Sequence, residues 1–308
     1  MLSVIIPSYN DEKALPLAIA SANAVKNVNE IIIIDDFSID NTQFLIKNIK
    51  KKVPKLKYFK NKKNLGTGYS FIKGLEKVKN SHVLMLNSDD FLVPPEIDKL
   101  YDFTLKNKLD LGYGKMAIKK ENGIFKYNHP GYKKKTYLGK RNELVDLLIF
   151  DMYIPSFGSI IRHKVLKKFY NKKYYKKVNE DYGGDFKAHD YDLFLNLAKQ
   201  KKKIGFLNEY VCVWCRKNSS QSGLKYVESG EACFESAFLF NRYYLNEKIN
   251  VQNFDLIESR VTKKYMDIKN SCNVNNQKTR KHYDNFISNI KKNKNFKKPS
   301  SNESLLMQ

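Results

Sequence analysis

The feature that most constrains the fold of this 308-residue chain is a short apolar run that ends in two adjacent carboxylates. Residues 83–86 read Val-Leu-Met-Leu, and Asp89 and Asp90 follow after the two intervening residues Asn87 and Ser88. Short runs of branched apolar side chains are typical of buried strands. Because adjacent carboxylates repel each other and raise each other's pKa, a divalent cation is their natural partner. A solvated turn is the alternative interpretation of the same pair.

Similar strand ends recur upstream. The apolar runs 2–6 and 30–34 also lead into polar clusters, and helices are expected near 13–24 and 41–51. This alternation predicts an α/β fold with a mostly parallel sheet. In such sheets the side chains at the carboxyl ends of the strands converge on one crevice, which is where ligands bind. We therefore expect the polar clusters to form a single site.

Four motifs then appear in a recognisable order. They are 4–10 (Val-Ile-Ile-Pro-Ser-Tyr-Asn), 33–42 (Ile-Ile-Asp-Asp-Phe-Ser-Ile-Asp-Asn-Thr), 64–66 (Asn-Leu-Gly) and 86–90 (Leu-Asn-Ser-Asp-Asp). Together they resemble the inverting family 2 glycosyltransferases, over roughly residues 1–220. The resemblance implies the GT-A fold, a Rossmann-like α/β sheet flanked by helices. It also implies transfer of a sugar from a nucleotide-diphosphate donor to a glycan or lipid-linked acceptor.

The resemblance assigns donor contacts to the strand ends. Pro7, Tyr9 and Asp36 would hold the base, with Asp36 accepting a hydrogen bond from the uracil imide, which favours a UDP-sugar. Arg216 and Lys217 would contact the diphosphate, charge against charge. The remaining donor-binding candidates are Asn10, Gly66, Asn87, Ser88 and Asp89.

Asp89 and Asp90 match the metal-binding signature of that family, and Asn218 is a further candidate ligand. The expected cofactor is Mn²⁺ or Mg²⁺, which prefer oxygen ligands. Asn87 stands where many relatives have the first aspartate of an Asp-x-Asp motif, and it contributes no charge. The choice between Asp89 and Asp90 as the direct ligand stays open.

Inverting transfer needs a carboxylate that accepts the proton of the attacking hydroxyl. The resemblance implies Asp190 as this general base, because an acidic pair opens a helix at the equivalent place in the family. His189 replaces the common Glu, and it can tune or pair with the aspartate. Asp192 is interpreted as an ordinary acid at a helix start.

Two other classes of function remain open. A catalytically inactive nucleotide-sugar or carbohydrate-binding relative fits the changes at Asn87 and His189. A nucleotidyltransferase shares acidic strand ends, but it is expected to carry a glycine-rich basic loop that residues 7–10 lack. Cys212 and Cys215 point to opposite faces of a predicted strand, which disfavours a shared zinc ion, so we expect buried, reduced thiols.

The charge of the chain is strongly basic. With 56 Lys and Arg against 32 Asp and Glu, the formal net charge is +24, which indicates an anionic partner or surface. The alternative is a chain that uses Lys and Asn liberally for solubility and has no specific anionic partner. Nucleic acid is not expected, because no nucleic-acid-binding motif is present.

Without a signal peptide or a long apolar run, we expect a cytoplasmic location, peripheral on the cytoplasmic face of the inner membrane. Lipid-linked acceptors for surface polysaccharide or glycolipid synthesis lie at that face.

The predicted catalytic domain covers residues 1–222, with a nucleotide-sugar half (1–110) and an acceptor half (111–222). A basic helical extension, 223–308, follows, and its lysine- and asparagine-rich end from residue 289 is expected to be disordered. The extension is expected either to dock on an anionic membrane or to pack as a cap or homodimer contact. Both alternatives stay open.

Overall fold

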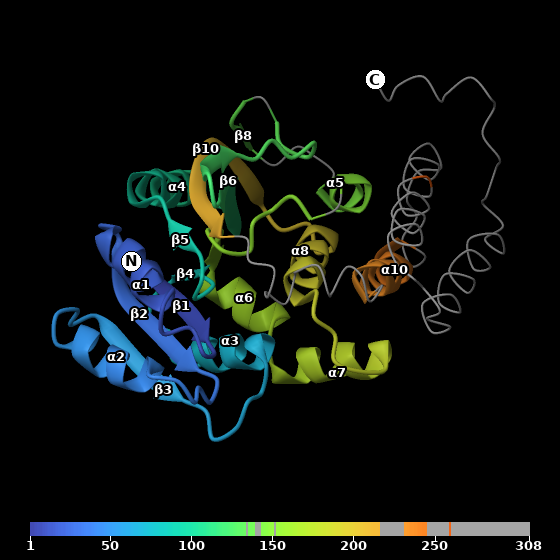
Figure 1. Cartoon of the computed structure of the whole chain (residues 1–308). Coiled ribbons are helices and arrows are strands. Elements are labelled where there is room, and N and C mark those ends of the chain that lie inside the picture. Colours follow the sequence, from blue (N-terminus) through green and yellow to red (C-terminus); the bar gives the residue numbers. More distant parts are fainter. Residues whose placement is uncertain (134, 139–142, 151, 216–230, 245–258, 260–308) are drawn as a thin grey trace, which may run out of the picture. The chain divides into compact units, whose positions relative to one another are not determined.

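The computed structural model describes residues 1–133, 135–138, 143–150, 152–215, 231–244 and 259. The chain divides into two compact units, residues 1–143 with 152–216, and residues 144–151 with 217–308. Figure 1 draws the helices and strands of the described residues. Within the second unit, helix α10 spans Glu231–Tyr244, inside the predicted helical extension. Helix α5 spans Glu143–Phe150. The predicted disordered end lies outside the described residues.

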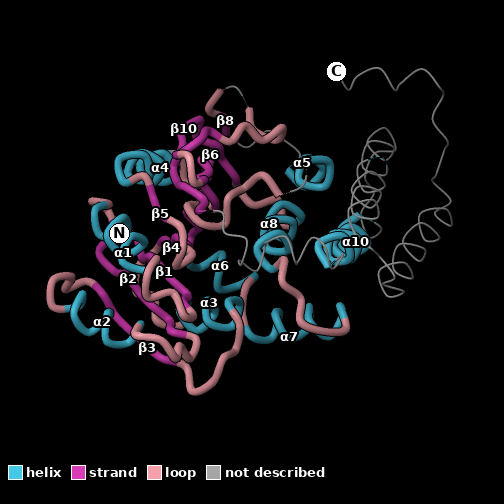
Figure 2. Tube along the Cα trace, in the orientation of Figure 1, coloured by secondary structure: helices cyan, strands magenta, loops and turns pink. Residues whose placement is uncertain are grey.

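Within the described residues, ten strands form one mixed sheet (Figure 2). The strand order is β3-β2-β1-β4-β9-β6-β10-β5, with β7 paired to β6 and β8 paired to β10. The bounds are β1 Leu2–Ser8, β2 Val28–Asp35, β3 Leu56–Lys60, β4 His82–Met85, β5 Phe91–Leu92, β6 Leu111–Lys120, β7 Gly123–Lys126, β8 Tyr137–Leu138, β9 Ile160–Arg162 and β10 Ile204–Cys215. Strands β3, β2, β1 and β4 are parallel, whereas β9 runs antiparallel to both neighbours. The predicted α/β fold is confirmed.

Helices in the first unit connect and cover these strands. Their bounds are α1 Leu15–Ala24, α2 Thr42–Lys50, α3 Thr67–Leu75, α4 Pro94–Lys106, α6 His163–Phe169, α7 Lys172–Tyr182 and α8 His189–Lys199. Local sequence explains several boundaries. Helix α4 begins at two prolines, whose missing N–H groups cost nothing in a first turn. Helix α7 begins where the Asn171 side chain accepts a hydrogen bond from the Tyr174 N–H, and it ends at Gly183 with φ +80°.

The central strands β1 and β2 are buried on both faces of the sheet. Val4 and Ile6 belong to a core shared with α1 and α4, whereas Ile5 points to the other face. There it packs so closely on Gly74 of α3 that any β-carbon at that position would overlap its side chain. Strands covered on both sides have no polar face, which explains the uninterrupted isoleucine run 31–34.

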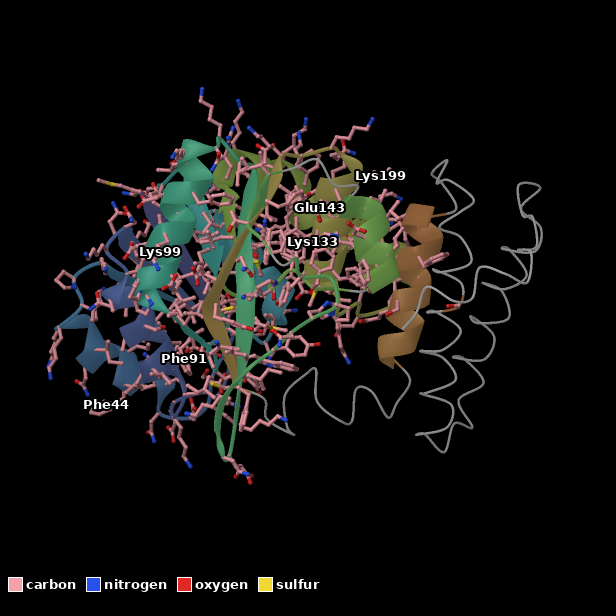
Figure 3. All side chains as sticks on the ribbon, turned by 90° about the horizontal axis from the view of Figure 1, so that it is seen from above. Phe44, Phe91, Lys99, Lys133, Glu143 and Lys199 are labelled. Carbon is pink, nitrogen blue, oxygen red and sulfur yellow. The ribbon has the colours of Figure 1, made fainter. Side chains whose placement is uncertain are left out.

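The outer surface, unlike the buried strands, carries charged side chains and some exposed apolar ones. Phe44 on α2 is 67% exposed and lies at the periphery of the first unit in Figure 3. Lys99 on α4 pairs with Glu96 of its own helix, at 2.9 Å. None of the helices that the structure describes has the length and apolar character needed to cross a lipid bilayer.

Candidate functional site

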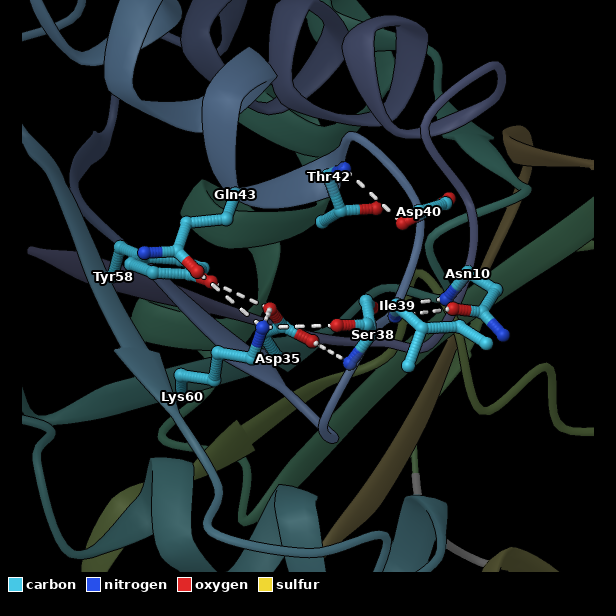
Figure 4. A network of polar contacts seen from close by, with 9 residues as sticks. All are labelled: Asn10, Asp35, Ser38, Ile39, Asp40, Thr42, Gln43, Tyr58 and Lys60. Carbon is cyan, nitrogen blue, oxygen red and sulfur yellow. Dashed lines mark hydrogen bonds and ion pairs between the residues drawn. The ribbon is translucent and has the colours of Figure 1, made fainter.

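The turns that follow β1 and β2 are tied together at the edge of the sheet. The backbone N–H of Asn10 donates to Ser38 Oγ at 2.9 Å, and the Asn10 side chain accepts from the Ile39 N–H at 2.9 Å (Figure 4). Asn10 and Phe37 both have left-handed backbone conformations, with φ +53° and +71°, which residues other than glycine rarely adopt. Such strain persists only where neighbouring contacts hold it. The strand ends therefore converge as predicted.

The two carboxylates at the end of β2 have different partners. Asp35 is fully buried and accepts hydrogen bonds from the Ser38 N–H at 2.7 Å and the Tyr58 hydroxyl at 2.5 Å (Figure 4). Burial and this hydrogen bond raise the pKa of Tyr58, so the phenol stays protonated and donates. Asp35 therefore stabilises the turn after β2 and has a structural role.

Asp36 points to the loop before α3. It accepts from the Asn61 side-chain amide at 2.7 Å. It also accepts from the backbone N–H groups of Leu65 and Gly66, at 2.9 and 2.7 Å. Gly66 has φ +85°, which explains the glycine of this motif. Among the described residues these are three donors, and because a carboxylate has about four acceptor positions, roughly one is left for a further donor.

Asn61 connects Asp36 to the body of α3. Its amide nitrogen also donates to Ser70 Oγ at 2.8 Å, and its oxygen accepts from Lys73 Nζ at 2.6 Å. Helix α3 is thus fastened to the carboxylate that the sequence assigns to the nucleotide base. A displacement of α3 would therefore disturb Asp36.

The acidic turn after β4 separates the roles of its two aspartates. Asp90 is 1% exposed and accepts from the Asn87 amide nitrogen and from the Cys215 N–H at the end of β10, both at 2.8 Å. Both carboxylate oxygens of Asp90 are therefore used within the protein. Asp89 is only half-buried, which makes it the better candidate for a metal ligand. Of the two aspartates, burial and hydrogen bonding therefore favour Asp89 as the candidate ligand.

Asp11 belongs to the same region, although no motif singled it out. The Ser88 hydroxyl donates to its carboxylate, so Asp11 joins the turns after β1 and β4. The available signal was its position directly after the polar turn 8–10. Of the predicted base contacts, Tyr9 is 47% exposed, whereas Pro7 is buried within β1.

Asp190 is the second residue of α8, at the helix start where the sequence places it. Burial raises the pKa of its carboxyl group, while hydrogen bonds from the Ser156 hydroxyl and the Tyr191 N–H act in the opposite direction. A carboxylate with a raised pKa is a better proton acceptor at neutral pH. Ser156 lies before β9, and no sequence signal pointed to it.

His189 does not form an ion pair with its neighbour. Burial lowers the pKa of His189 to about 3, so the imidazole is neutral. Its ring stacks on Tyr175 at 3.8 Å between centroids and meets the edge of Phe186 at 4.9 Å. The pairing with Asp190 considered from sequence is therefore wrong, because the ring is desolvated among aromatic side chains.

Asp192 lies in the first turn of α8, as expected, but it is 1% exposed. Its carboxylate accepts a hydrogen bond from the Tyr174 hydroxyl of α7 at 2.7 Å. It is therefore an anchor between two helices, and the interpretation as an ordinary helix-start acid missed this contact.

Other predicted site residues, Arg216, Lys217 and Asn218, lie outside the described residues. In the part of the chain that the structure describes, no three His, Cys, Asp or Glu residues gather to form a metal site. At phosphate sites Mg²⁺ is commonly held by one or two carboxylates, water and the substrate's phosphates. Asp89 fits that role.

Replacing Ser156 by Ala is expected to shift the pH dependence of turnover. The Ser156 hydroxyl stabilises the ionised form of Asp190, so its loss raises the pKa of that carboxyl group further. A base is active only when deprotonated, so activity would be lost at a higher pH than in the unmodified protein. The acidic limb of the kcat–pH profile should move up by about 0.5–1 pH unit, since such a hydrogen bond contributes about 1 kcal/mol. A limb that stays in place or moves down contradicts this assignment.

Comparison with known proteins decides the family. The profile of Glycosyl transferase family 2 matches residues 3–169. The chain belongs to this family. Its sheet matches the GT-A structures of that group, including Staphylococcus aureus TarS 1–349, with a TM-score of 0.65 at 18% identity over 94% of this chain and 79% of that one.

Several sequence relatives of this family 2 glycosyltransferase are known. A Campylobacter jejuni GalNAc(5)-diNAcBac-PP-undecaprenol beta-1,3-glucosyltransferase is 28% identical over 65% of this chain and 60% of its own length. An uncharacterised Haemophilus influenzae glycosyltransferase is 34% identical over 38% of this chain and 48% of its own length. The chain thus spans about half of these relatives. TarS was also solved with UDP-GlcNAc, with a TM-score of 0.64, and a Pyrobaculum calidifontis mannosyltransferase with GDP-Man and Mn²⁺, with a TM-score of 0.57.

Proposed function

We propose that this family 2 glycosyltransferase transfers a sugar from a UDP-sugar, with inversion, to a hydroxyl group of a glycan or lipid-linked acceptor. The observation that carries the proposal is Asp190, a carboxylate at the start of α8 whose burial raises its pKa. It belongs to the same compact unit as the turns bearing Asp36 and Asp89. Inverting transfer in one displacement requires one general base and one site that stabilises the departing diphosphate, here at the carboxyl ends of the strands.

The donor is held by the strand ends. Tyr9, with half of its side chain exposed, stacks on the base, and the remaining acceptor position of Asp36 receives the uracil imide N–H. Asn10 holds the turn through Ser38 and Ile39, so its role is to shape the site. Structures of TarS with UDP and UDP-GlcNAc support a uridine donor.

Asp89 would hold a divalent ion, Mn²⁺ or Mg²⁺, together with the diphosphate. When bound, such an ion supplies charge stabilisation for the departing nucleotide. Asp90 fixes the turn that carries Asp89, through Asn87 and Cys215. The neutral Asn87 is thereby explained as a partner of Asp90, because its amide nitrogen must face that carboxylate.

The chemical step is one displacement. The acceptor oxygen attacks the anomeric carbon, its proton passes to Asp190, and the bond from that carbon to the diphosphate oxygen breaks. Attack from the side opposite the leaving group inverts the anomeric centre. Asp190 needs no second carboxylate as an acid, because the diphosphate leaves as a stable anion.

Lipid-linked acceptors fit the charge of the chain. The Campylobacter relative is named for a substrate linked to undecaprenyl diphosphate, and the net charge of +24 favours an anionic surface. We place the protein in the cytoplasm, docked on the inner membrane during synthesis of surface polysaccharide or glycolipid. Docking or homodimer formation through 223–308 stays a prediction, since most of that segment lies outside the described residues.

A thermal-shift panel tests the donor assignment. UDP with Mn²⁺ should raise Tm by a few degrees at a concentration of about 100 times Kd, because ligand binding to the folded state stabilises by about 2.7 kcal/mol. GDP, CDP and dTDP should give smaller shifts, and a chelator should reduce the shift by UDP. A larger shift with GDP contradicts the uridine assignment. Binding of UDP-sugars without transfer or hydrolysis would favour the inactive relative instead.

A further inference from the structure

The first turn of α8 is held by an aromatic ring from α7. The Tyr175 ring is 3% exposed and stacks on His189 at 3.8 Å between centroids, with an interplanar angle of 27°. It also contacts α3, where it meets the Tyr69 ring at 4.4 Å between centroids. It also lies so close to Gly68 that any β-carbon there would overlap the Tyr175 ring. One side chain therefore bridges α3 and α8.

Each of the two helices joined by Tyr175 is connected to a group with a proposed role in catalysis or substrate binding. His189 precedes Asp190 in the chain. At the other end, α3 is fastened to Asp36 through Asn61, which binds Ser70 and Lys73. A second bond, from the Tyr174 hydroxyl to Asp192 at 2.7 Å, fixes the same turn of α8 to α7.

We propose that Tyr175 is a positioning residue, whose ring between Gly68 and His189 sets the position of the Asp190 carboxylate relative to the nucleotide-binding turn. This inference rests on the proposed role of Asp190 as the base. It also accounts for His189, which stands where the family resemblance has Glu. A flat, neutral imidazole stacks on Tyr175, whereas a buried Glu would place an unpaired charge against the same ring. The stacking on Tyr175 thus gives His189 a structural role, so the replacement of Glu by His is not by itself a sign of an inactive protein.

Tyr175→Leu is the central test. It should lower kcat by about 10–100-fold with the donor KM changed less than about threefold, because misplacement of a catalytic group by about 1 Å costs up to about 10²-fold. The acidic limb of the kcat–pH profile should move to lower pH, as water reaches Asp190 and relieves its desolvation.

Tyr101→Leu is the matched control. Tyr101 is also buried, and it also contacts a histidine, since its ring meets His82 edge-on at 5.8 Å. This control should lose Tm to a similar extent while kcat and the pH profile stay in place. Equal losses of kcat in the two variants, or an unchanged kcat for Tyr175→Leu, overturn the proposal.

Substitutions at His189 separate stacking from chemistry. His189→Phe keeps a ring against Tyr175 and should retain kcat within about threefold, whereas His189→Glu should lose at least about tenfold despite restoring the family's common residue. A His189→Phe protein as slow as Tyr175→Leu shows that the imidazole itself is required, and this overturns the positioning role of the ring.

Gly68→Ala tests the contact with α3. The added methyl group should displace Tyr175 and lower kcat by about tenfold, and combining it with Tyr175→Leu should cost less than the product of the two effects. Multiplicative losses contradict the bridge. The proposed function is tested separately by Asp190→Asn. If that variant is active, the base assignment fails, and if it is inactive while Tyr175→Leu is normal, only this inference fails.

Discussion

Asp190→Asn is expected to lower kcat by about 10²–10⁴-fold, which is the range that general-base catalysis typically contributes. The amide keeps the shape of the side chain but cannot accept the proton of the acceptor hydroxyl. Hydrogen bonds from Ser156 and Tyr191 can still reach its oxygen, so the fold and UDP affinity should be preserved. Single-turnover transfer to a defined acceptor, with UDP affinity measured by calorimetry, gives the two quantities.

Asp185→Asn serves as the control for this experiment. Asp185 is an exposed acid five residues before Asp190, in the loop that leads to α8. Its replacement changes the net charge equally and should leave kcat within a factor of about two. Near-normal turnover by Asp190→Asn would remove that residue from the role of base.

The second large effect is expected at Asp89. Asp89→Ala should reduce activity by about 10²-fold or more, because loss of several kcal/mol of charge stabilisation on the leaving group corresponds to about tenfold for each 1.36 kcal/mol. Mn²⁺ binding in the presence of UDP should be lost, and Tm without ligands should fall less than it does for Asp90→Ala, because Asp89 is half-buried whereas Asp90 is buried. Calorimetry with Mn²⁺ and a thermal scan measure both.

Asp90→Ala provides the contrast. Asp90 is buried and accepts hydrogen bonds from Asn87 and Cys215, so its removal leaves two donors unsatisfied, at about 1–3 kcal/mol each. The ligand-free protein should therefore unfold at a clearly lower temperature. If Asp90→Ala abolishes Mn²⁺ binding without loss of stability, and Asp89→Ala does the reverse, the two roles have been assigned the wrong way round.

Much of the site could be predicted because it follows the strands. Asp36 and Asp89 lie two and three residues after apolar runs, and parallel strands bring their carboxyl ends to one edge. Asp190 was found through a motif at a helix start. In contrast, Asp11 and Ser156 reach the site by tertiary hydrogen bonds, and their local sequence carries no distinctive pattern.

The sequence by itself determined the α/β sheet, the polar strand ends and the carboxylate that opens α8, because hydrophobic periodicity and motif spacing are local properties of the chain. Only the tertiary structure decided which member of each acidic pair serves the fold. Asp35 and Asp90 accept hydrogen bonds from Tyr58 and Cys215, whereas Asp36 is bound by the loop before α3 and Asp89 is only half-buried. Burial and hydrogen-bond partners are set by segments far apart in the chain, so adjacent, identical residues acquire different roles.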